Sequence, residues 1–180
     1  AASPLTREIT HIVTDLDEVR IASFNVENLD PSDGATKFAA LAAAIAVNLN
    51  APDILSLAEV QDNSGATNDG ITDAGITLQM LVDAIAAAGG PTYAWQQIDP
   101  ANNQDGGEPG GNIRVALLYN PERVGFVEGS LQRLTDTEPS DGDTFASSRK
   151  PLAGTFTFNG ETITVVANHF NSKGGDQPLF

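Results

Sequence analysis

The chain has 180 residues, the length of one domain, and its 24 acidic residues against 9 basic ones give a formal net charge of −15. So strong an acidic excess argues against a general nucleic-acid-binding surface, because affinity for a phosphate backbone comes largely from Lys and Arg. A local cluster of basic side chains, or bound divalent cations, would reverse the field at one site. The sequence contains no cysteine, which excludes disulfides, thiolate metal sites and a cysteine nucleophile.

No stretch of the sequence reaches the ~20 apolar residues of a membrane helix, so we expect no membrane partner. The chain begins Ala1-Ala2-Ser3-Pro4, without an initiator methionine and without a basic and apolar leader. This start predicts a processed protein or a piece of a larger one.

The first half of the sequence predicts strands alternating with helices. Strands are expected over residues 20–26 and 53–60, and helices over 35–48 and 76–88. The run 53–60 is apolar almost throughout, which is typical of a strand covered on both faces. Residues 1–17 give no firm assignment, although 9–13 is compatible with a short strand or a turn.

The second half predicts mainly strands. They are expected over 93–98, 113–119, 124–127, 130–134, 152–158 and 161–168. Asn159-Gly160 separates the last two and is the strongest short signal for a hairpin. The loops 61–73, 99–111 and 135–148 are long and polar, which is common for loops that carry function. This order of elements predicts an α/β sandwich with helices outside and antiparallel pairs within it.

Four polar or charged residues interrupt the apolar pattern at strand ends. They are Asn25, Glu59, Arg114 and His169. Polar groups at the ends of several strands of one sheet can converge on a common rim. A half-buried Glu is costly unless a cation, a donor or a metal pairs with it. A lone carboxylate suits Mg²⁺ or Ca²⁺ better than Zn²⁺, and a cation, an Arg and a His together favour phosphoryl transfer.

The segment that ends in His169 has the form of a catalytic rim. An apolar strand delivers one of the only two histidines of the chain, and a polar, glycine-rich loop with Asn171 and Lys173 follows directly. The alternative interpretation is a strand-end histidine that makes ordinary surface hydrogen bonds.

Four segments, in order, resemble the endonuclease/exonuclease/phosphatase superfamily. They are residues 21–29, 53–60, 113–119 and 166–169. Within that superfamily, residues 111–121 and 168–174 look most like the large secreted bacterial nucleases. The resemblance covers about residues 19 to 175. It implies a four-layer, deoxyribonuclease-like α/β sandwich in a secreted protein, and cleavage of a phosphodiester of DNA or RNA by water, assisted by a metal and by histidine acid/base chemistry.

The resemblance also implies roles for individual residues. Glu59 resembles the ligand of the divalent metal, Mg²⁺ or otherwise Ca²⁺ or Mn²⁺, and Asn25 the amide that supports the metal or the scissile phosphate. Glu27 lies where abasic-site nucleases of the superfamily have an acidic residue, so it is a further candidate ligand. His169 resembles the catalytic histidine, and Arg114 the strand arginine near the active site.

Two candidate substrate contacts and two departures complete the comparison with the superfamily. Asn171 and Lys173 are the candidate phosphate contacts. Pancreatic-type deoxyribonucleases carry an acidic residue before the strand arginine, where it orients the histidine, but Asn112 and Ile113 stand there in this sequence. An amide can orient an imidazole but does not stabilise imidazolium as a carboxylate does. Gln61 stands two positions after Glu59, where some members of the superfamily have a basic residue.

The superfamily's Gly-Asp-x-Asn motif and terminal Asp-His pair are not found in the sequence. We therefore expect residues 1–18 to be an N-terminal extension and 19–180 to be the N-terminal part of a catalytic domain. The C-terminal half of that domain is the expected partner, as a second chain or as a continuation. The 180 residues alone are expected to be inactive.

Two alternatives remain open at this point. A lipid or inositol phosphate phosphodiesterase or phosphatase of the same superfamily would share the strand motifs, and the acidic surface suits its substrates at least as well as DNA. A non-catalytic, calcium-stabilised secreted binding module would use acidic loops such as 62–73 to hold Ca²⁺.

Overall fold

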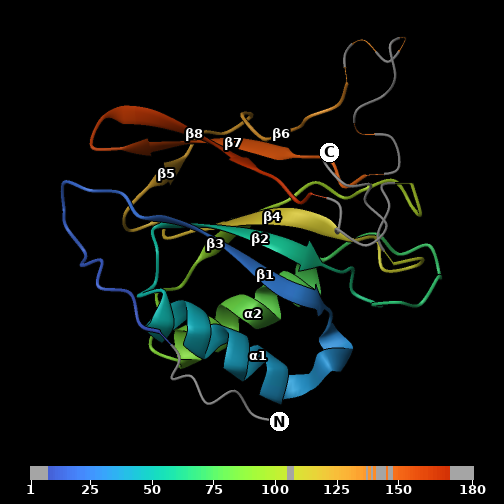
Figure 1. The fold of residues 1–180 in the computed structure, drawn as a ribbon, viewed down its shortest axis with the longest axis horizontal. Coiled ribbons are helices and arrows are strands. Elements are labelled where there is room, and N and C mark those ends of the chain that lie inside the picture. The colour runs from blue at the N-terminus through green and yellow to red at the C-terminus, as the bar shows by residue number, and fades with distance from the viewer. Residues whose placement is uncertain are drawn as a thin grey trace, which may run out of the picture.

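The computed structural model describes residues 8–104, 108–136, 138, 140, 145 and 148–170. Two β-sheets pack face to face, and helices cover the outer face of one of them (Figure 1). The expected α/β sandwich is therefore confirmed. In the part that the structure describes, it consists of a helical layer, a first sheet and a second sheet.

The first sheet contains two strands from the first half of the chain and two from the second. These are β1 (Ile21–Leu29), β2 (Ile54–Val60), β3 (Ala94–Gln96) and β4 (Arg114–Tyr119), in the spatial order β1-β2-β4-β3. β2 pairs in parallel with β1 and antiparallel with β4. Six of its seven residues are buried, as its nearly continuous apolar sequence predicted.

The helical layer packs on the first sheet. It comprises η1 (Pro31–Asp33), α1 (Gly34–Ala43), η2 (Ala44–Asn48) and α2 (Gly75–Ala87). The predicted helix over 35–48 is confirmed, but its last turn is π-helical, with the Leu49 amide donating to the carbonyl of Ala44. Within the described ranges, no helix is long and apolar enough to cross a bilayer.

The second sheet is built around its longest hairpin. Its strands are β5 (Gly125–Phe126), β6 (Gln132–Arg133), β7 (Leu152–Phe158) and β8 (Glu161–Ala167). β7 is central and pairs antiparallel with each of the others. The turn residues Asn159 (φ 48°) and Gly160 (φ 84°) are both left-handed, as a type I′ hairpin requires, so the predicted hairpin is confirmed.

Apolar side chains fill both interfaces of the sandwich. The side chains of Leu55 and Leu57 face the helices, and those of Ile54 and Leu117 face the second sheet. In the interface between the sheets, Phe156 is fully buried and lies 5.4 Å, between ring centroids, from Tyr119. The two cores fix the orientation of β2 and β8, and therefore of the side chains at their ends.

Asp53, just before β2, anchors the end of the sandwich at which β1 and β2 begin. Its side chain is fully buried and accepts hydrogen bonds from the backbone amide of Arg20 (2.8 Å) and from Arg123 Nε (3.0 Å). Arg123 also donates to the carbonyls of Asp15 and Glu18, which holds the segment before β1 against the sheets. The negative charge of this one carboxylate thus lies beside the positive charges of two arginines that are themselves mostly buried.

We expect Asp53→Asn to lower the free energy of unfolding by about 3 kcal/mol, because removing one partner of a buried ionic group leaves the others uncompensated. Urea denaturation followed by circular dichroism measures this change. The control is Glu122→Gln, an exposed carboxylate nearby, which should stay within about 0.5 kcal/mol of the wild type. Equal stability of the two variants would contradict the anchoring role.

Candidate active site

Three of the predicted site residues meet at one end of the sandwich. Asn25 Nδ2 donates to Glu59 Oε1 at 2.8 Å, and His169 Nε2 lies 3.3 Å from the same oxygen. Asn25 comes from β1 and Glu59 from β2, whereas His169 follows β8 of the other sheet. The cluster therefore bridges the two sheets.

Glu59 reaches this position through a break in the alternation of β2. Its φ angle is 63°, in the left-handed region that is costly for a residue with a β-carbon. Leu57 and Val60 both pack in the helix-side core, although a regular strand would place 57 and 59 on the same side. Between the pairs Leu57↔Ala116 and Val60↔Arg114, β2 advances three residues and β4 two. The extra residue is a β-bulge that keeps the Glu59 side chain out of the core.

β1 bulges beside β2. Glu27 (φ 56°) and Asn28 (φ 54°) are also left-handed, and the pairing shifts between Asn25 and Leu29. The Glu27 amide donates to Asn25 Oδ1 at 2.7 Å. Because this oxygen accepts, the amide nitrogen of Asn25 is the atom turned toward Glu59. Two neighbouring bulges thus set the geometry of the cluster.

Glu27, the second candidate metal ligand, lies next to the cluster but outside it. Its side chain is exposed, and its carbonyl accepts a hydrogen bond from Lys37 Nζ at 2.7 Å. Asn25, Glu27 and Lys37 line an open groove of about 540 Å³ beside α1. Among the described residues, the structure brings Asn25 and Glu59 together but records no contact of the Glu27 carboxylate with either.

The partners of Glu59 within the described ranges are neutral. Burial lowers the pKa of His169 below its ordinary value, and Arg149 lowers it further, while attraction to Glu59 acts in the opposite direction. A neutral imidazole and an amide do not compensate a carboxylate. Glu59 is 25% exposed, so the cluster presents one negative charge at a half-buried position.

This arrangement fits one side of a site for a hard divalent cation. Mg²⁺ is commonly held by one or two carboxylates together with water and substrate phosphate. Glu59 would be the ligand, and Asn25 would hold its carboxylate in place. No group of three or more His, Asp or Glu side chains that could hold a metal gathers among the residues that the structure describes.

Arg114, the fourth predicted residue, holds a loop. It pairs with Val60 across the sheet, and its guanidinium donates to Asp99 Oδ1 (2.8 Å) and Gln97 Oε1 (3.1 Å). Burial lowers the pKa of Arg114, and the charge of Asp99 opposes this effect. The recorded bonds of Arg114 therefore fix the chain after β3 and do not reach the Glu59 carboxylate.

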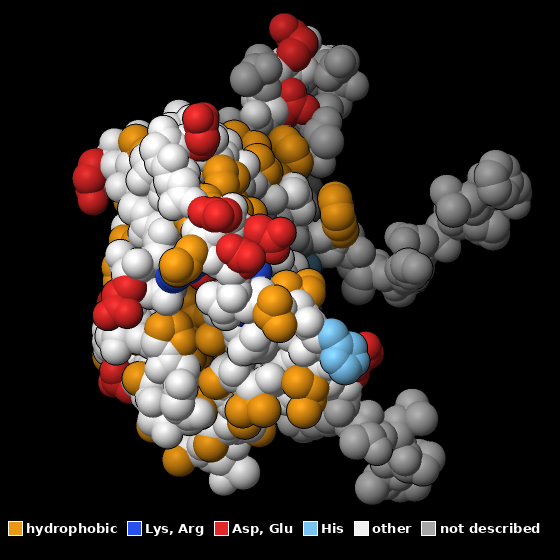
Figure 2. Space-filling model, turned by 90° about the vertical axis from the view of Figure 1, so that its left-hand side faces the viewer, with side chains coloured by type: hydrophobic (Ala, Val, Ile, Leu, Met, Phe, Trp, Pro, Cys, Tyr) orange, Lys and Arg blue, Asp and Glu red, His pale blue; other side chains and the backbone are white. Residues whose placement is uncertain are grey.

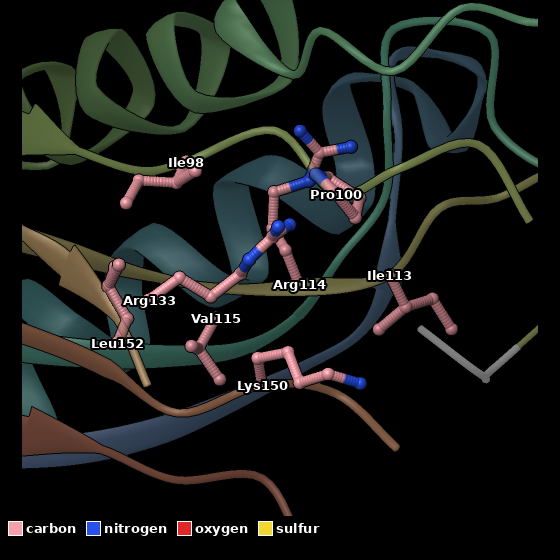
Figure 3. A pocket seen from close by; sticks show the side chains of 8 residues that line it. All are labelled: Ile98, Pro100, Ile113, Arg114, Val115, Arg133, Lys150 and Leu152. Carbon is pink, nitrogen blue, oxygen red and sulfur yellow. The ribbon is translucent and has the colours of Figure 1, made fainter. Parts of the chain in front are cut away.

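Arg114 also lines a small cavity between the sheets with Arg133 and Lys150. Figure 3 shows Arg114 rising toward Pro100, while the Lys150 ammonium points away from both arginines. The cavity measures about 20 Å³, which is room for about one water molecule. Arg114 Nε is buried without a hydrogen-bond partner, so a buried water fits this space better than a phosphate does.

Basic residues are unevenly distributed in this acidic chain. Of the nine Lys and Arg, Arg7 and Lys173 lie outside the described residues, which leaves seven. Among these, Arg149 contacts His169, Arg114 pairs with Val60 next to Glu59, and Lys37 donates to the Glu27 carbonyl. Figure 2 shows the opposite end of the sandwich, where acidic side chains are spread over the surface and little Lys or Arg is visible. Basic side chains are therefore present at the cluster end of the molecule.

Asn112 and Gln61, the two departures from the superfamily pattern, both hold loops. Asn112 Nδ2 donates to Asp62 Oδ2 and to the carbonyl of Ile71, each at 2.8 Å. Gln61 is buried and donates to Glu108. Asn112 has no recorded contact with His169. These hydrogen bonds hold the loop 61–73 against Glu108 and Asn112, beside the strand ends.

Sequence analysis missed Arg149. Its Nε donates to His169 Nδ1 at 3.2 Å. The guanidinium therefore lies beside the histidine, where pancreatic-type deoxyribonucleases have an acidic residue that orients the ring. The pairing Leu152↔Ala167, continued two residues beyond the hairpin, places Lys150 opposite His169. The register set by the Asn159-Gly160 turn therefore predicts that Arg149 and His169 lie close together.

Asn171 and Lys173, the candidate phosphate contacts, lie outside the described residues.

Three solved structures have a fold similar to that of this chain, in which the polar cluster lies at the strand ends. No protein-family model matches the sequence, and no curated protein matches it. A solved structure of D. rerio TDP2, humanized by 14 mutations, has a TM-score of 0.52 and 18% identity over 86% of this chain. D. rerio TDP2 complexed with a single-strand DNA product has a TM-score of 0.51 and 18% identity over 87%.

A third solved structure of similar fold is bacterial. It is an endonuclease/exonuclease/phosphatase family protein from Leptotrichia buccalis C-1013-b, with a TM-score of 0.51 and 14% identity over 88% of this chain. At these identities the similarity shows the fold. The alignments cover 51%, 48% and 56% of the three solved chains, so this chain spans about half their length.

We expect the left-handed bulge to be visible in stability measurements. Glu59→Gly and Glu59→Ala both remove the contacts to Asn25 and His169, but only Ala retains the left-handed strain. The Gly variant should therefore be more stable than the Ala variant by about 1 kcal/mol, measured by urea denaturation.

The control position is Thr162, an exposed residue of β8 without a left-handed φ. There the order should reverse, with Gly less stable than Ala by roughly 0.5–1 kcal/mol, because Gly weakens an extended strand. The same order at both positions would contradict the assigned bulge.

Proposed function

We propose that this chain is the N-terminal part of a secreted, divalent-metal-dependent phosphodiesterase of the endonuclease/exonuclease/phosphatase superfamily, acting on DNA or RNA. The observation that carries the proposal is the Glu59 carboxylate. It is held at a strained bulge with two neutral partners, Asn25 and His169. A strained and uncompensated carboxylate beside an imidazole is costly for stability, which favours a functional role.

The charge of the protein supports metal use. A polyanionic substrate is repelled by a chain with a net charge of −15 unless the field is reversed locally. A divalent cation, Mg²⁺ or otherwise Ca²⁺ or Mn²⁺, would polarise the phosphoryl group and activate water for attack when it is bound. Glu59 would hold that cation, and Asn25 would keep the carboxylate oriented.

His169 would act as a proton donor or acceptor at the scissile phosphate. Its Nε2 faces the Glu59 carboxylate, so it borders the space in which a phosphate bound next to Glu59 would lie. The basic residues at this end of the molecule, Arg149 and Lys37 among them, would attract the neighbouring phosphates. Arg114 contributes to this field and also holds the adjacent loop.

The choice of nucleic acid as substrate rests on two supports. One structural neighbour, D. rerio TDP2, is complexed with a single-strand DNA product. The resemblance of residues 111–121 and 168–174 to large secreted bacterial nucleases agrees with this choice and is the basis for proposing secretion.

We further propose that the C-terminal half of the domain completes the site. Three observations support this: the chain spans about half of its structural neighbours, the described cluster has one carboxylate, and β1 and β8 are edge strands. Between these edges lies an open groove of about 390 Å³, lined by residues of β1, β2 and β8 together with Asn168. Further strands pairing with both edges would close it.

The proposal predicts that Glu59→Gln lowers Mg²⁺-dependent cleavage of plasmid DNA by at least about 100-fold, because even residues behind a metal ligand commonly contribute 10–100-fold. Cleavage should be measured in the complete protein that contains this chain, with unchanged circular dichroism as the test of folding. Asp83→Asn, an exposed carboxylate on α2, is the control and should retain activity.

Unchanged activity of Glu59→Gln would remove Glu59 from the site. A choline phospholipid, assayed in parallel, separates a nuclease from a lipid phosphodiesterase. Failure to cleave either substrate, with a melting temperature that rises with Ca²⁺, would instead support a calcium-stabilised binding module.

A further inference from the structure

Arg149 holds the end of β8 in two places. Its Nε donates to His169 Nδ1 at 3.2 Å, and its Nη2 donates to the carbonyl of Phe170 at 3.0 Å. The His169 side chain is 15% exposed, so its ring is mostly shielded from water. Two bonds to consecutive residues restrict both the rotation of the imidazole and the backbone that carries it.

The chemistry of the guanidinium determines which ring nitrogen carries the proton. Arginine has only N–H donors and stays protonated, so the ring nitrogen facing it must accept. The proton of a neutral His169 therefore lies on Nε2. That nitrogen faces Glu59 Oε1 at 3.3 Å, and a carboxylate oxygen can only accept. Arg149 and Glu59 thus select the same tautomer from opposite sides of the ring.

A carboxylate in the place of Arg149 would have the opposite effect. It would accept from Nδ1–H and leave Nε2 with a lone pair, ready to take a proton. The guanidinium leaves Nε2–H instead, which is ready to donate. The identity of this one neighbour therefore decides whether the imidazole meets its substrate as a base or as a donor.

We propose that Arg149 is a positioning residue that fixes His169 as the Nε2–H tautomer and aims this N–H at the space beside Glu59. The proposal rests on the function proposed above, in which a phosphate enters that space. With Glu59 holding a cation, the Nε2–H of His169 would donate to a phosphoryl oxygen. His169 then stabilises the charge of the phosphoryl group during attack by water, and it does not remove the proton from that water.

Long-range ¹H–¹⁵N NMR spectra of the ¹⁵N-labelled protein distinguish the two tautomers. The chain has only two histidines, and the exposed His11 is an internal reference. His11→Gln assigns the signals. At about pH 8, above the ordinary histidine pKa of about 6.5, both rings can be compared in the neutral form. We expect His11 to show a mixture and His169 to show at least tenfold less of the Nδ1–H form.

Two substitutions complete the test. Arg149→Lys, which can only donate, should keep Nε2–H at His169, and Arg149→Glu should convert it to Nδ1–H. If the wild-type protein showed the same mixture of tautomers at His169 as at His11, the proposal would be overturned. This comparison needs no variant. Retention of Nε2–H in a folded Arg149→Glu protein would also overturn the proposal. These spectra need neither metal nor substrate, so their outcome is independent of whether the protein cleaves phosphodiesters.

Discussion

The left-handed bulge at Glu59 is the constraint on which the candidate site depends. β2 is an inner strand of its sheet, bound by hydrogen bonds to β1 on one side and β4 on the other. Regular alternation would bury the residue at position 59 among the apolar side chains that surround Leu57. The bulge returns Val60 to that core and places the carboxylate at the sheet edge, where Asn25 and His169 reach it. The strain at one residue is compensated by the packing of the whole strand.

β2 connects two carboxylates with opposite surroundings. Asp53, before its first residue, is fully buried and paired with two arginines, which suits an anchor. Glu59, near its last residue, has an amide and a neutral imidazole as its partners among the described residues. A carboxylate compensated by protein cations has little further affinity for a metal, whereas one with neutral partners attracts a cation. The direct partners of the two carboxylates thus separate the structural end of the strand from the proposed functional one.

Much of the fold could be predicted because its signals are local. Apolar runs marked β2 and β4, and Asn159-Gly160 fixed the hairpin and its register. The bulge could not be predicted, because a glutamate residue does not itself indicate a positive φ. The hydrogen bonds of β2 to β1 and β4 impose this φ. The position of Arg114 followed the strand pattern, but its partners, Asp99 and Gln97, come from a loop whose path the pattern does not determine. The contact of Arg149 with His169 follows from the hairpin register, but the resemblance to the superfamily points to an acidic residue beside the histidine and not to an arginine.

We propose that Glu59 binds a divalent cation beside His169. Mn²⁺ tests it directly, because it substitutes for Mg²⁺ at oxygen ligands and its unpaired electrons broaden nearby NMR signals. Mn²⁺ should broaden the ring signals of His169, whose Nε2 is 3.3 Å from the Glu59 carboxylate, far more than those of His11. In Glu59→Gln, the His169 signals should persist at the same Mn²⁺ concentration. Equal broadening of the two histidines, or unchanged broadening of His169 in Glu59→Gln, would contradict it.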